Sequence, residues 1–155
     1  MDRMRESIFA ILGDLEGASF LDIFSGTGII ALEAASRGAS YIEAVEMDPL
    51  KRSTLLDNMK MSPVHVHCRF MPAELYVKRA KRDFDFIFCD PPFPYRHKVQ
   101  LLRSIAASPL VRQGTRLLLH CPRGELNDLP ADNCILQEVR EYGRSAVIFF
   151  SFFAI

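Results

Sequence analysis

Apolar positions along the chain change their spacing from one segment to the next in a regular way. Short, almost continuous apolar runs, typical of buried strands, alternate with segments whose apolar residues recur at helical spacing. Glycine or proline marks several of the boundaries. Five alternations predict a mostly parallel sheet with helices on both faces. The expected strands are 20–24, 41–46, 64–70, 84–89 and 116–121, and the expected helices are 2–12, 29–37, 49–61, 72–81 and 99–107.

The last part of the chain has a different pattern. Residues 135–142 and 145–153 are extended runs joined by a tight turn at Gly143 and Arg144, which predicts a hairpin. We expect this hairpin to add an antiparallel strand to the sheet. No repeat or linker interrupts the chain. The sequence therefore predicts a single α/β domain over residues 1–155, with a doubly wound, mostly parallel seven-stranded sheet and a C-terminal antiparallel hairpin.

Composition and charge narrow the class of protein. The 155 residues are 49% hydrophobic and 25% charged, which excludes a collagenous, disordered or disulfide-scaffold chain. Nineteen basic residues balance nineteen acidic ones, but residues 1–60 hold six Lys or Arg against ten Asp or Glu. The other thirteen basic residues face nine acidic ones. This excess of cations in residues 61–155 points weakly to an anionic partner, and scattered solvated charge explains it equally well.

The cysteines and histidines do not form a metal-binding pattern. No Cys-x-x-Cys pair is present, and no histidine has zinc-ligand spacing. His65 and His67 share one face of a predicted strand without an evident third ligand. The N-terminus is charged and lacks the long apolar segment of a signal peptide. We expect a cytoplasmic protein with no bound metal, no membrane partner and four reduced thiols: Cys68, Cys89, Cys121 and Cys134.

A glycine-containing turn follows the first predicted strand, where ligands bind in sheets of this kind. Within the run 22–28, Gly26 and Gly28 permit a tight turn and close backbone approach to a ligand in front of a helix. Glu46 ends the second strand, where its carboxylate can accept both hydroxyl protons of a ribose. Together these features predict an adenosine-type cofactor. The alternative is a packed turn followed by an ordinary surface glutamate.

This spacing alone fits NAD as well as S-adenosylmethionine. Asp22 separates the two, because a carboxylate at the end of the first strand would repel a pyrophosphate. The same carboxylate could hold the loop or the cationic methionine part of S-adenosylmethionine. An NAD-dependent oxidoreductase would also need a proton relay, and none is obvious in the sequence.

The run Asp90-Pro91-Pro92-Phe93 ends the fourth predicted strand. Two prolines stiffen the turn and leave their carbonyls without local donors. The Asp90 carboxylate and the Pro91 carbonyl can converge on one flat NH2 group, while Phe93 offers a face for a planar base. Two acceptors on the amine protons favour a pyramidal nitrogen with its lone pair aimed at a methyl group. This run therefore predicts methylation of a base amine, the alternative being a proline-rich turn capped by Asp90.

The chain resembles class I S-adenosylmethionine-dependent methyltransferases, which have a Rossmann-like fold, and within them the RsmD family of 16S rRNA guanine-N2 methyltransferases. The main matching segments are Arg3-x-Arg5-Glu6-Ser7-Ile8-Phe9-x-Ile11-Leu12, Phe20-Leu21-Asp22-Ile23-Phe24-Ser25-Gly26-Thr27-Gly28, Leu32-Glu33-Ala34-x-Ser36-Arg37-Gly38-Ala39 and Asp90-Pro91-Pro92-Phe93. Shorter matches are Val45-Glu46, Asn58 and Tyr142-Gly143-Arg144.

The resemblance implies a role for each matching position. Asp90, Pro91, Pro92 and Phe93 would hold a target guanine that is single-stranded or flipped out. The cofactor would contact Asp22, Phe24, Ser25, Gly26, Thr27, Gly28, Glu46, Met47 and Asp90. The implied partner is 16S rRNA or the assembling small ribosomal subunit, with the protein acting as a monomer.

Two departures from the family pattern concern the RNA and the adenine. The sequence starts directly at the first predicted helix, so we expect it to lack the family's N-terminal basic hairpin. Other cations are candidates for contact with RNA. Candidates are Arg5, Arg96 and Lys98, whereas the run 78–82 is interpreted first as a solvated helix end. An acidic residue common in relatives after the third strand is replaced by the stretch 70–73, which leaves adenine recognition open.

Two other functions remain open at this point. The same chemistry could act on adenine or cytosine amines of DNA or RNA. Alternatively, the chain could be a non-catalytic protein of this fold that binds RNA or an assembly partner.

Overall fold

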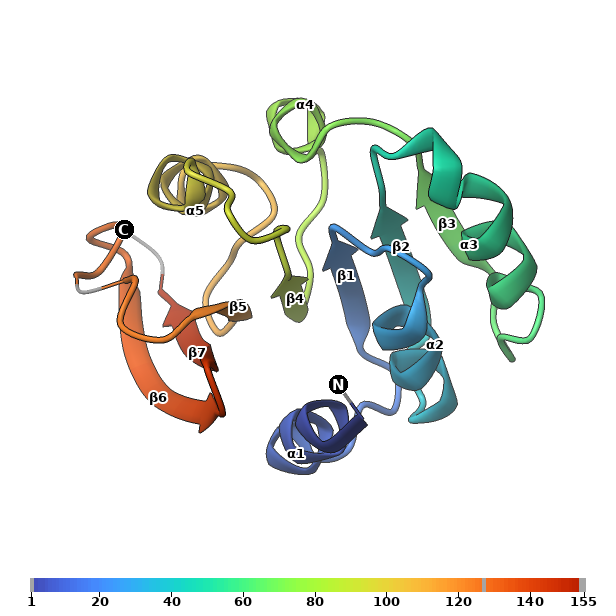
Figure 1. The fold of residues 1–155 in the computed structure, drawn as a ribbon, viewed down its shortest axis with the longest axis horizontal. Coiled ribbons are helices and arrows are strands. Elements are labelled where there is room, and N and C mark those ends of the chain that lie inside the picture. The colour runs from blue at the N-terminus through green and yellow to red at the C-terminus, as the bar shows by residue number, and fades with distance from the viewer. Residues whose placement is uncertain (1, 127, 154–155) are drawn as a thin grey trace.

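The computed structural model describes residues 2–126 and 128–153 and centres on a seven-stranded sheet with the order β3-β2-β1-β4-β5-β7-β6 (Figure 1). Strands β1 to β5 run parallel, and β7 pairs antiparallel with both β5 and β6. The predicted fold class is confirmed. The strands are β1 (Ser19–Ile23), β2 (Tyr41–Val45), β3 (Val66–Arg69), β4 (Phe86–Cys89), β5 (Arg116–Pro122), β6 (Cys134–Tyr142) and β7 (Ser145–Phe152).

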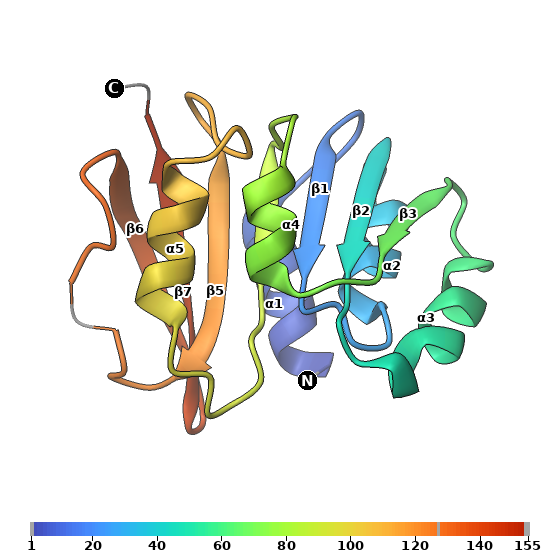
Figure 2. The same cartoon turned by 90° about the horizontal axis from the view of Figure 1, so that it is seen from above.

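Helices cover both faces of the sheet, with α1, α2 and α3 on one side and α4 and α5 on the other (Figures 1 and 2). Successive strand residues point to opposite faces. Phe20 therefore packs in the core under α1 and α2, whereas Leu21 and Ile23 pack in the core under α4 and α5. The helices are α1 (Asp2–Leu12), α2 (Ile29–Ser36), α3 (Arg52–Met59), α4 (Ala73–Arg79) and α5 (Lys98–Ala106).

The predicted helix at 49–61 is split in two. It begins as a short 3-10 helix, η1 (Pro49–Lys51), and continues as α3 to Met59. The Asp48 side chain accepts a hydrogen bond from the Leu50 N–H at 3.0 Å, which satisfies one of the free donors at the start of the segment. The segment therefore begins where the proline predicts and ends two residues early.

The C-terminal hairpin joins the sheet through its second strand, β7, and its first strand, β6, forms the edge of the sheet. Strand β7 lies between β5 and β6, and residues Ala146 to Phe150 are buried. Strand β6 is the edge and is mostly exposed. An apolar run such as β7 is stable only when both of its faces are covered, whereas the polar residues of β6 tolerate an edge position.

The four cysteines are free, as expected for reduced thiols. Cys89, Cys121 and Cys134 are buried, and Cys68 is half-buried. No helix in the described part of the chain is long and apolar enough to cross a membrane. Within residues 2–126 and 128–153, no group of three or more His, Cys, Asp or Glu side chains could hold a metal ion.

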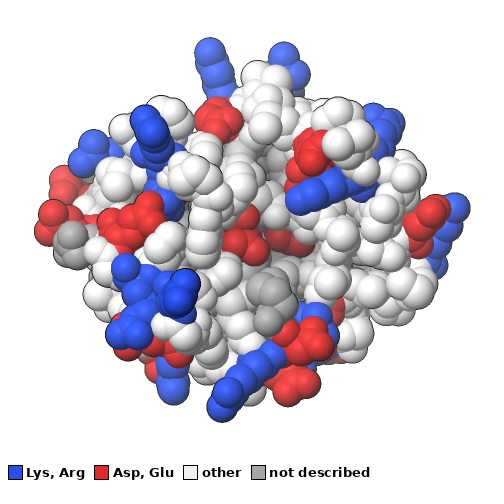
Figure 3. Space-filling model, in the orientation of Figure 1, with Lys and Arg blue, Asp and Glu red and all other residues white. Residues whose placement is uncertain are grey.

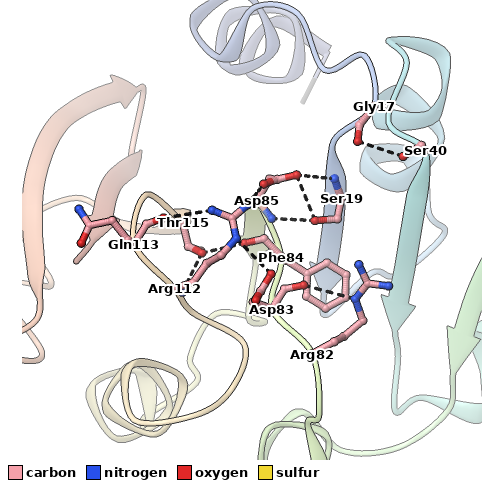
Figure 4. Close-up of polar contacts among 10 residues, drawn as sticks. All are labelled: Gly17, Ser19, Ser40, Arg82, Asp83, Phe84, Asp85, Arg112, Gln113 and Thr115. Carbon is pink, nitrogen blue, oxygen red and sulfur yellow. Dashed lines mark hydrogen bonds and ion pairs between the residues drawn. The ribbon is translucent and has the colours of Figure 1, made fainter. Parts of the chain in front are cut away.

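A hydrogen-bonded network ties the strands together at the amino-terminal edge of the sheet (Figure 4). Asp85 accepts hydrogen bonds from the Ser19 N–H at 2.8 Å and from Ser19 Oγ at 3.2 Å, and it pairs with Arg112. The Arg112 Nε also donates to Asp83 at 3.1 Å. Thr115 Oγ1 donates to the Phe84 carbonyl at 2.8 Å. Both carboxylates at this edge are therefore matched by donors.

Candidate active site

A cavity of about 780 Å³ opens at the carboxyl-terminal edge of the sheet, beyond the ends of β1, β2 and β4. Arrowheads of β1, β2 and β5 point to this edge in Figure 2, and Figure 3 looks onto it. Asp and Glu atoms lie at the bottom of a central hollow whose walls are mostly uncharged (Figure 3). The predicted residues that line the cavity are Asp22, Phe24, Ser25, Gly26, Thr27, Glu46, Met47, Asp90, Pro91, Pro92 and Phe93.

The turn after β1 forms one wall of this cavity. The backbone of Phe24 has a φ of 62° and that of Gly26 a φ of 61°, so the chain reverses sharply between them. A left-handed backbone is uncommon outside glycine and often marks a functional turn. A Cβ added at Gly26 would meet nothing within 4 Å, because this position opens toward the cavity. The Ser25 N–H donates to the Val45 carbonyl at 2.8 Å and joins the turn to β2.

Gly28 does not line the cavity, which differs from its expected role as a cofactor contact. Its φ is 84°, and an added Cβ would lie 2.6 Å from Leu55 Cδ1 and 2.5 Å from Met59 Cε. The position therefore excludes a side chain because α2 begins against α3. The glycine is needed both for its left-handed backbone at the end of the turn and for packing between helices.

Glu46 is held by the backbone on both of its carboxylate oxygens. Oε1 accepts the Gly26 N–H at 2.6 Å, and Oε2 accepts the Asp48 N–H at 2.9 Å. These bonds fix the carboxylate between the ends of β1 and β2. Each carboxylate oxygen has two lone pairs, so both oxygens retain capacity to accept a hydroxyl proton. This geometry suits the predicted contact with a ribose.

Asp22 is fully buried beneath the turn. Ser25 Oγ donates to Asp22 Oδ2 at 2.7 Å and ties the loop to the strand. Burial, together with the nearby negative charges of Asp90 and Glu46, outweighs the hydrogen bond from Ser25 and raises the pKa of the Asp22 carboxyl from 3.8 to about 7. Below about pH 7 the unliganded site therefore favours the protonated form of Asp22, and a cation nearby would favour the charged form.

The Asp90–Phe93 turn stands opposite the glycine turn. Asp90 and the Pro91 backbone face the cavity, and no donor within the described residues bonds to the Pro91 carbonyl. The Tyr95 N–H closes the turn on the Pro92 carbonyl at 2.8 Å. Phe93 is 48% exposed, which is a large fraction for an aromatic ring beside a cavity. The turn thus brings Asp90, Pro91 and Phe93 to one wall of the cavity, and their role in holding a base amine stays a prediction.

His120 is a residue of this site that the sequence analysis missed. It follows Leu119, which pairs with Cys89 across β4 and β5, so His120 lies next to Asp90. The distance between His120 Nδ1 and Asp90 Oδ1 is 2.8 Å, and the imidazole centroid is 5.4 Å from that of Phe93. His120 Nε2 is buried without a hydrogen-bond partner in the described structure. With an ionised Asp90, which only accepts, Nδ1 would be the donor in this contact.

The three cations predicted to contact RNA have different surroundings. Lys98 is buried, with 7% of its side chain exposed, and pairs with Glu125 and the Tyr95 carbonyl. The ammonium therefore already has partners inside the protein and does not face the solvent where the prediction placed it. Arg5 is partly exposed and contacts Asp2 and Glu33 at 3.2 and 3.4 Å. Arg96 is exposed and follows Tyr95, which lines the cavity.

The side of the cavity beyond β3 is mainly apolar. Met71 and Ala73 line it in place of the acidic residue common in relatives, and Met47 covers it from the end of β2. Glu74 also lines the cavity, but Tyr95 Oη donates to its carboxylate at 2.5 Å. Apolar side chains on two sides suit a flat adenine ring, whose recognition the sequence left open.

The charges of the cavity identify the kind of ligand that fits it. Five lining residues are Asp or Glu, whereas Lys51 is the lining cation among the described residues. A pyrophosphate would meet repulsion there, and the sulfonium and ammonium of S-adenosylmethionine would meet opposite charge. With the sheet order and the turn after β4, this cavity defines a class I S-adenosylmethionine-dependent methyltransferase.

The chain belongs to the family described as Conserved hypothetical protein 95, whose model matches residues 1–151, and the resemblance to RsmD is confirmed.

Similar proteins cover the chain to different extents. "Putative rRNA methyltransferase YlbH" of Bacillus subtilis is 29% identical over 94% of this chain and 83% of its own length. A tRNA1(Val) (adenine(37)-N6)-methyltransferase of Shewanella loihica is 32% identical over 50% of this chain, which spans 35% of that enzyme. The solved structure of a conserved hypothetical protein from Streptococcus pyogenes is 26% identical with a TM-score of 0.88, covering 96% of this chain and 94% of that one.

Proposed function

We propose that this protein transfers a methyl group from S-adenosylmethionine to the exocyclic N2 amine of a guanine in 16S ribosomal RNA. Its partner would be the 16S rRNA itself or the assembling small subunit, with the protein acting as a monomer. The name of the Bacillus subtilis relative, which matches nearly the whole chain, supports a ribosomal RNA substrate. The observation that carries the proposal is the Asp90–Phe93 turn, which faces the acidic cavity across the carboxyl ends of the strands.

The residues of the first two strands would hold the cofactor. Glu46 would accept the ribose hydroxyl protons, Asp22 would balance the cationic methionine part, and the turn from Phe24 to Thr27 would surround it. When bound, S-adenosylmethionine supplies an electrophilic methyl group on a sulfonium centre. The apolar wall at Met71 and Ala73 would cover the adenine.

The residues after β4 would prepare the amine. An exocyclic amine is a weak nucleophile, because its lone pair is delocalised into the ring. The Asp90 carboxylate and the Pro91 carbonyl would each accept one N–H proton, which favours a pyramidal nitrogen with a localised lone pair. Phe93 would stack on the base and keep its ring plane fixed. The methylated nitrogen is strongly acidic, so its proton can pass to Asp90 or to water without a strong base.

His120 would act as a positioning residue for this step. Its Nδ1 lies 2.8 Å from Asp90 Oδ1, and a hydrogen bond donated by Nδ1 would restrict rotation of the carboxylate. Asp90 Oδ2 then remains to accept from the amine. The imidazole also supports the Phe93 ring, whose centroid lies 5.4 Å away. The histidine would therefore orient both groups that hold the base.

A second substrate, the N6 amine of adenine in tRNA, is favoured by the relative from Shewanella loihica, whose name states that activity. Adenine and guanine both present a flat exocyclic NH2 group, and the acceptor pair of Asp90 and Pro91 suits either. The identity of the base depends on contacts with the rest of its ring.

The experiment offers labelled S-adenosylmethionine with three acceptors: small subunits, free 16S rRNA and tRNA from cells that lack the corresponding modification. Nucleoside mass spectrometry then identifies the product, with Asp90→Ala as the inactive control. N2-methylguanosine in the ribosomal RNA is expected. N6-methyladenosine in tRNA would select the second substrate, and transfer to none of the acceptors would overturn both. Calorimetry with S-adenosylmethionine and NAD checks the cofactor, because tight binding of NAD alone would contradict the proposal.

A further inference from the structure

A second groove, of about 350 Å³, lies beside the active-site cavity, between α4 and the strands β2 and β3. Met71 lines both hollows, so the groove begins where the cofactor cavity ends. Helix α4 has seven residues and is therefore about 10 Å long. The groove follows this helix from Met71 toward Arg79. Its far end is formed by the segment that leads from α4 to β4.

Four cations line this groove, from two different parts of the fold. Arg69 comes from β3, whereas Arg79, Lys81 and Arg82 come from the end of α4 and the segment after it. All four are exposed. Within the described residues, no carboxylate lies within ion-pair distance of Arg79, Lys81 or Arg82. The favourable position of cations at a helix C-terminus accounts for Arg79, but not for Arg69 or for the two residues beyond the helix.

The nearest carboxylates in the sequence do not neutralise the groove. Figure 4 shows Asp83 and Asp85 turned toward Arg112, whereas the Arg82 guanidinium lies on the other side of the chain, beside the Phe84 ring. Arg112 pairs with both carboxylates. The Arg82 guanidinium instead stacks 3.6 Å from the centre of the Tyr41 ring. The arrangement leaves positive charge facing the groove.

Glu43, the acidic residue in the lining, is buried and already has donors. The Tyr41 and Tyr76 hydroxyls each donate to its carboxylate at 2.6 Å, and Arg69 Nε lies 3.5 Å away. Its charge therefore offsets one of the four cations, and the groove keeps an excess of positive charge.

A row of rings continues from the groove along the open edge of the sheet. The rings of Tyr41 and His67 stack with centroids 4.8 Å apart, and His65 lies 4.6 Å from His67. These three residues share one face because side chains alternate along β2 and β3. Flat rings beside a line of cations are the combination that proteins use to bind single-stranded nucleic acid.

We propose that this groove binds the phosphate backbone of a single-stranded segment of the RNA substrate, outside the segment that enters the active site. The inference rests on the proposed function, because that function supplies an RNA. Arg79 and Lys81 would contact phosphates, Arg69 and Arg82 would strengthen the field, and the exposed His65 ring at the end of the row would contact a base. The continuity at Met71 places this contact beside the cofactor cavity. The groove would add affinity without choosing the base that is methylated.

The test compares Arg79→Gln/Lys81→Gln with Lys60→Gln/Arg103→Gln, a control that removes the same charge from exposed positions outside the groove. The first measurement is binding of a fluorescent single-stranded RNA of about 16 nucleotides over a range of salt concentrations. Each phosphate contact on a single strand contributes about 0.7 to the salt slope, so the groove variant should lose about 1.4. Its affinity should fall about tenfold at moderate salt. The control should behave like the wild type.

The second measurement is methyl transfer, which separates this proposal from the proposed function. The groove variant should raise the KM for RNA about tenfold and leave kcat and S-adenosylmethionine binding unchanged. If the wild type methylates RNA and the variant keeps its KM and salt slope, the groove proposal is wrong and the function stands. If no RNA is methylated but groove-dependent binding persists, the function fails and the groove stands. A change in oligomeric state without a change in RNA binding would instead identify the groove as a contact between copies of this chain.

Discussion

The carboxylates at the two edges of the parallel sheet have opposite electrostatic surroundings. At the amino-terminal edge, Asp85 accepts from Ser19 and pairs with Arg112, which also binds Asp83. At the carboxyl-terminal edge, Asp22, Glu46 and Asp90 lie close enough for Asp90 and Glu46 to raise the pKa of Asp22. At the first edge, Asp83 and Asp85 are matched by donors, and these contacts stabilise the fold. The second keeps an unfavourable concentration of negative charge that a cationic ligand relieves, as binding sites commonly do.

The strongest test of this contrast removes the charge of Asp90 with Asp90→Asn. The amide keeps the shape of the turn but cannot offer two acceptor oxygens beside the Pro91 carbonyl. We expect kcat for methyl transfer to fall about 10²- to 10³-fold, while S-adenosylmethionine still binds. Single-turnover kinetics and calorimetry measure the two effects separately. Undiminished transfer would contradict the role given to Asp90.

The pH dependence of cofactor binding tests Asp22, whose pKa is about 7 in the folded protein and 3.8 in the unfolded reference. Between these values the folded chain binds more protons, so the free energy of unfolding of the unliganded protein should fall as pH rises from about 4 to about 7. A cationic ligand favours the charged carboxylate and expels that proton. Affinity for S-adenosylmethionine should therefore fall up to about 100-fold from pH 7 to about pH 5.

Calorimetry in two buffers of different ionisation enthalpy would detect the released proton directly. Asp22→Asn serves as the matched control, because it keeps an acceptor for Ser25 Oγ but cannot titrate. Its affinity should be weaker above pH 7 and nearly independent of pH. A wild-type affinity that does not change across this range would overturn the assignment.

The complementary change at the other edge is Asp85→Asn. Arg112 would lose a charged partner, and the bonds to Ser19 would weaken. We expect the free energy of unfolding to fall by about 2 kcal/mol. Urea denaturation measures this loss, and kcat of the folded fraction should not change. A loss of kcat at full occupancy of the folded state would show that the amino-terminal edge also affects catalysis.

The smallest expected effect concerns His120, whose Nδ1 contacts Asp90. His120→Leu should lower kcat about tenfold, because the carboxylate loses its orienting donor, with the KM for S-adenosylmethionine unchanged. His120→Asn places an amide donor close to the position of Nδ1 and should restore much of the rate. Equal rates in both variants would mean that the imidazole only fills space.

Much of the site was predictable because its residues are adjacent in the sequence. The run from Asp22 to Gly28 and the run from Asp90 to Phe93 each follow a predicted strand, and parallel strands bring such ends to one edge. The surroundings of two predicted site residues, Gly28 and Lys98, differ from the expectation because they depend on neighbours distant in the sequence. Gly28 faces Leu55 and Met59 of α3 instead of the cavity, and Lys98 is buried against Glu125.

The sequence by itself determined the alternation of strands and helices, the acidic and glycine-rich turn, and the position of the Asp90–Phe93 run at a strand end. These depend on local periodicity and backbone preference, which a short segment expresses alone. Only the tertiary structure placed β7 between β5 and β6, His120 against Asp90, and Arg69 beside Arg79 and Lys81. It also decided the protonation of Asp22, because burial and neighbouring charge set a pKa, and both arise when distant strands pair.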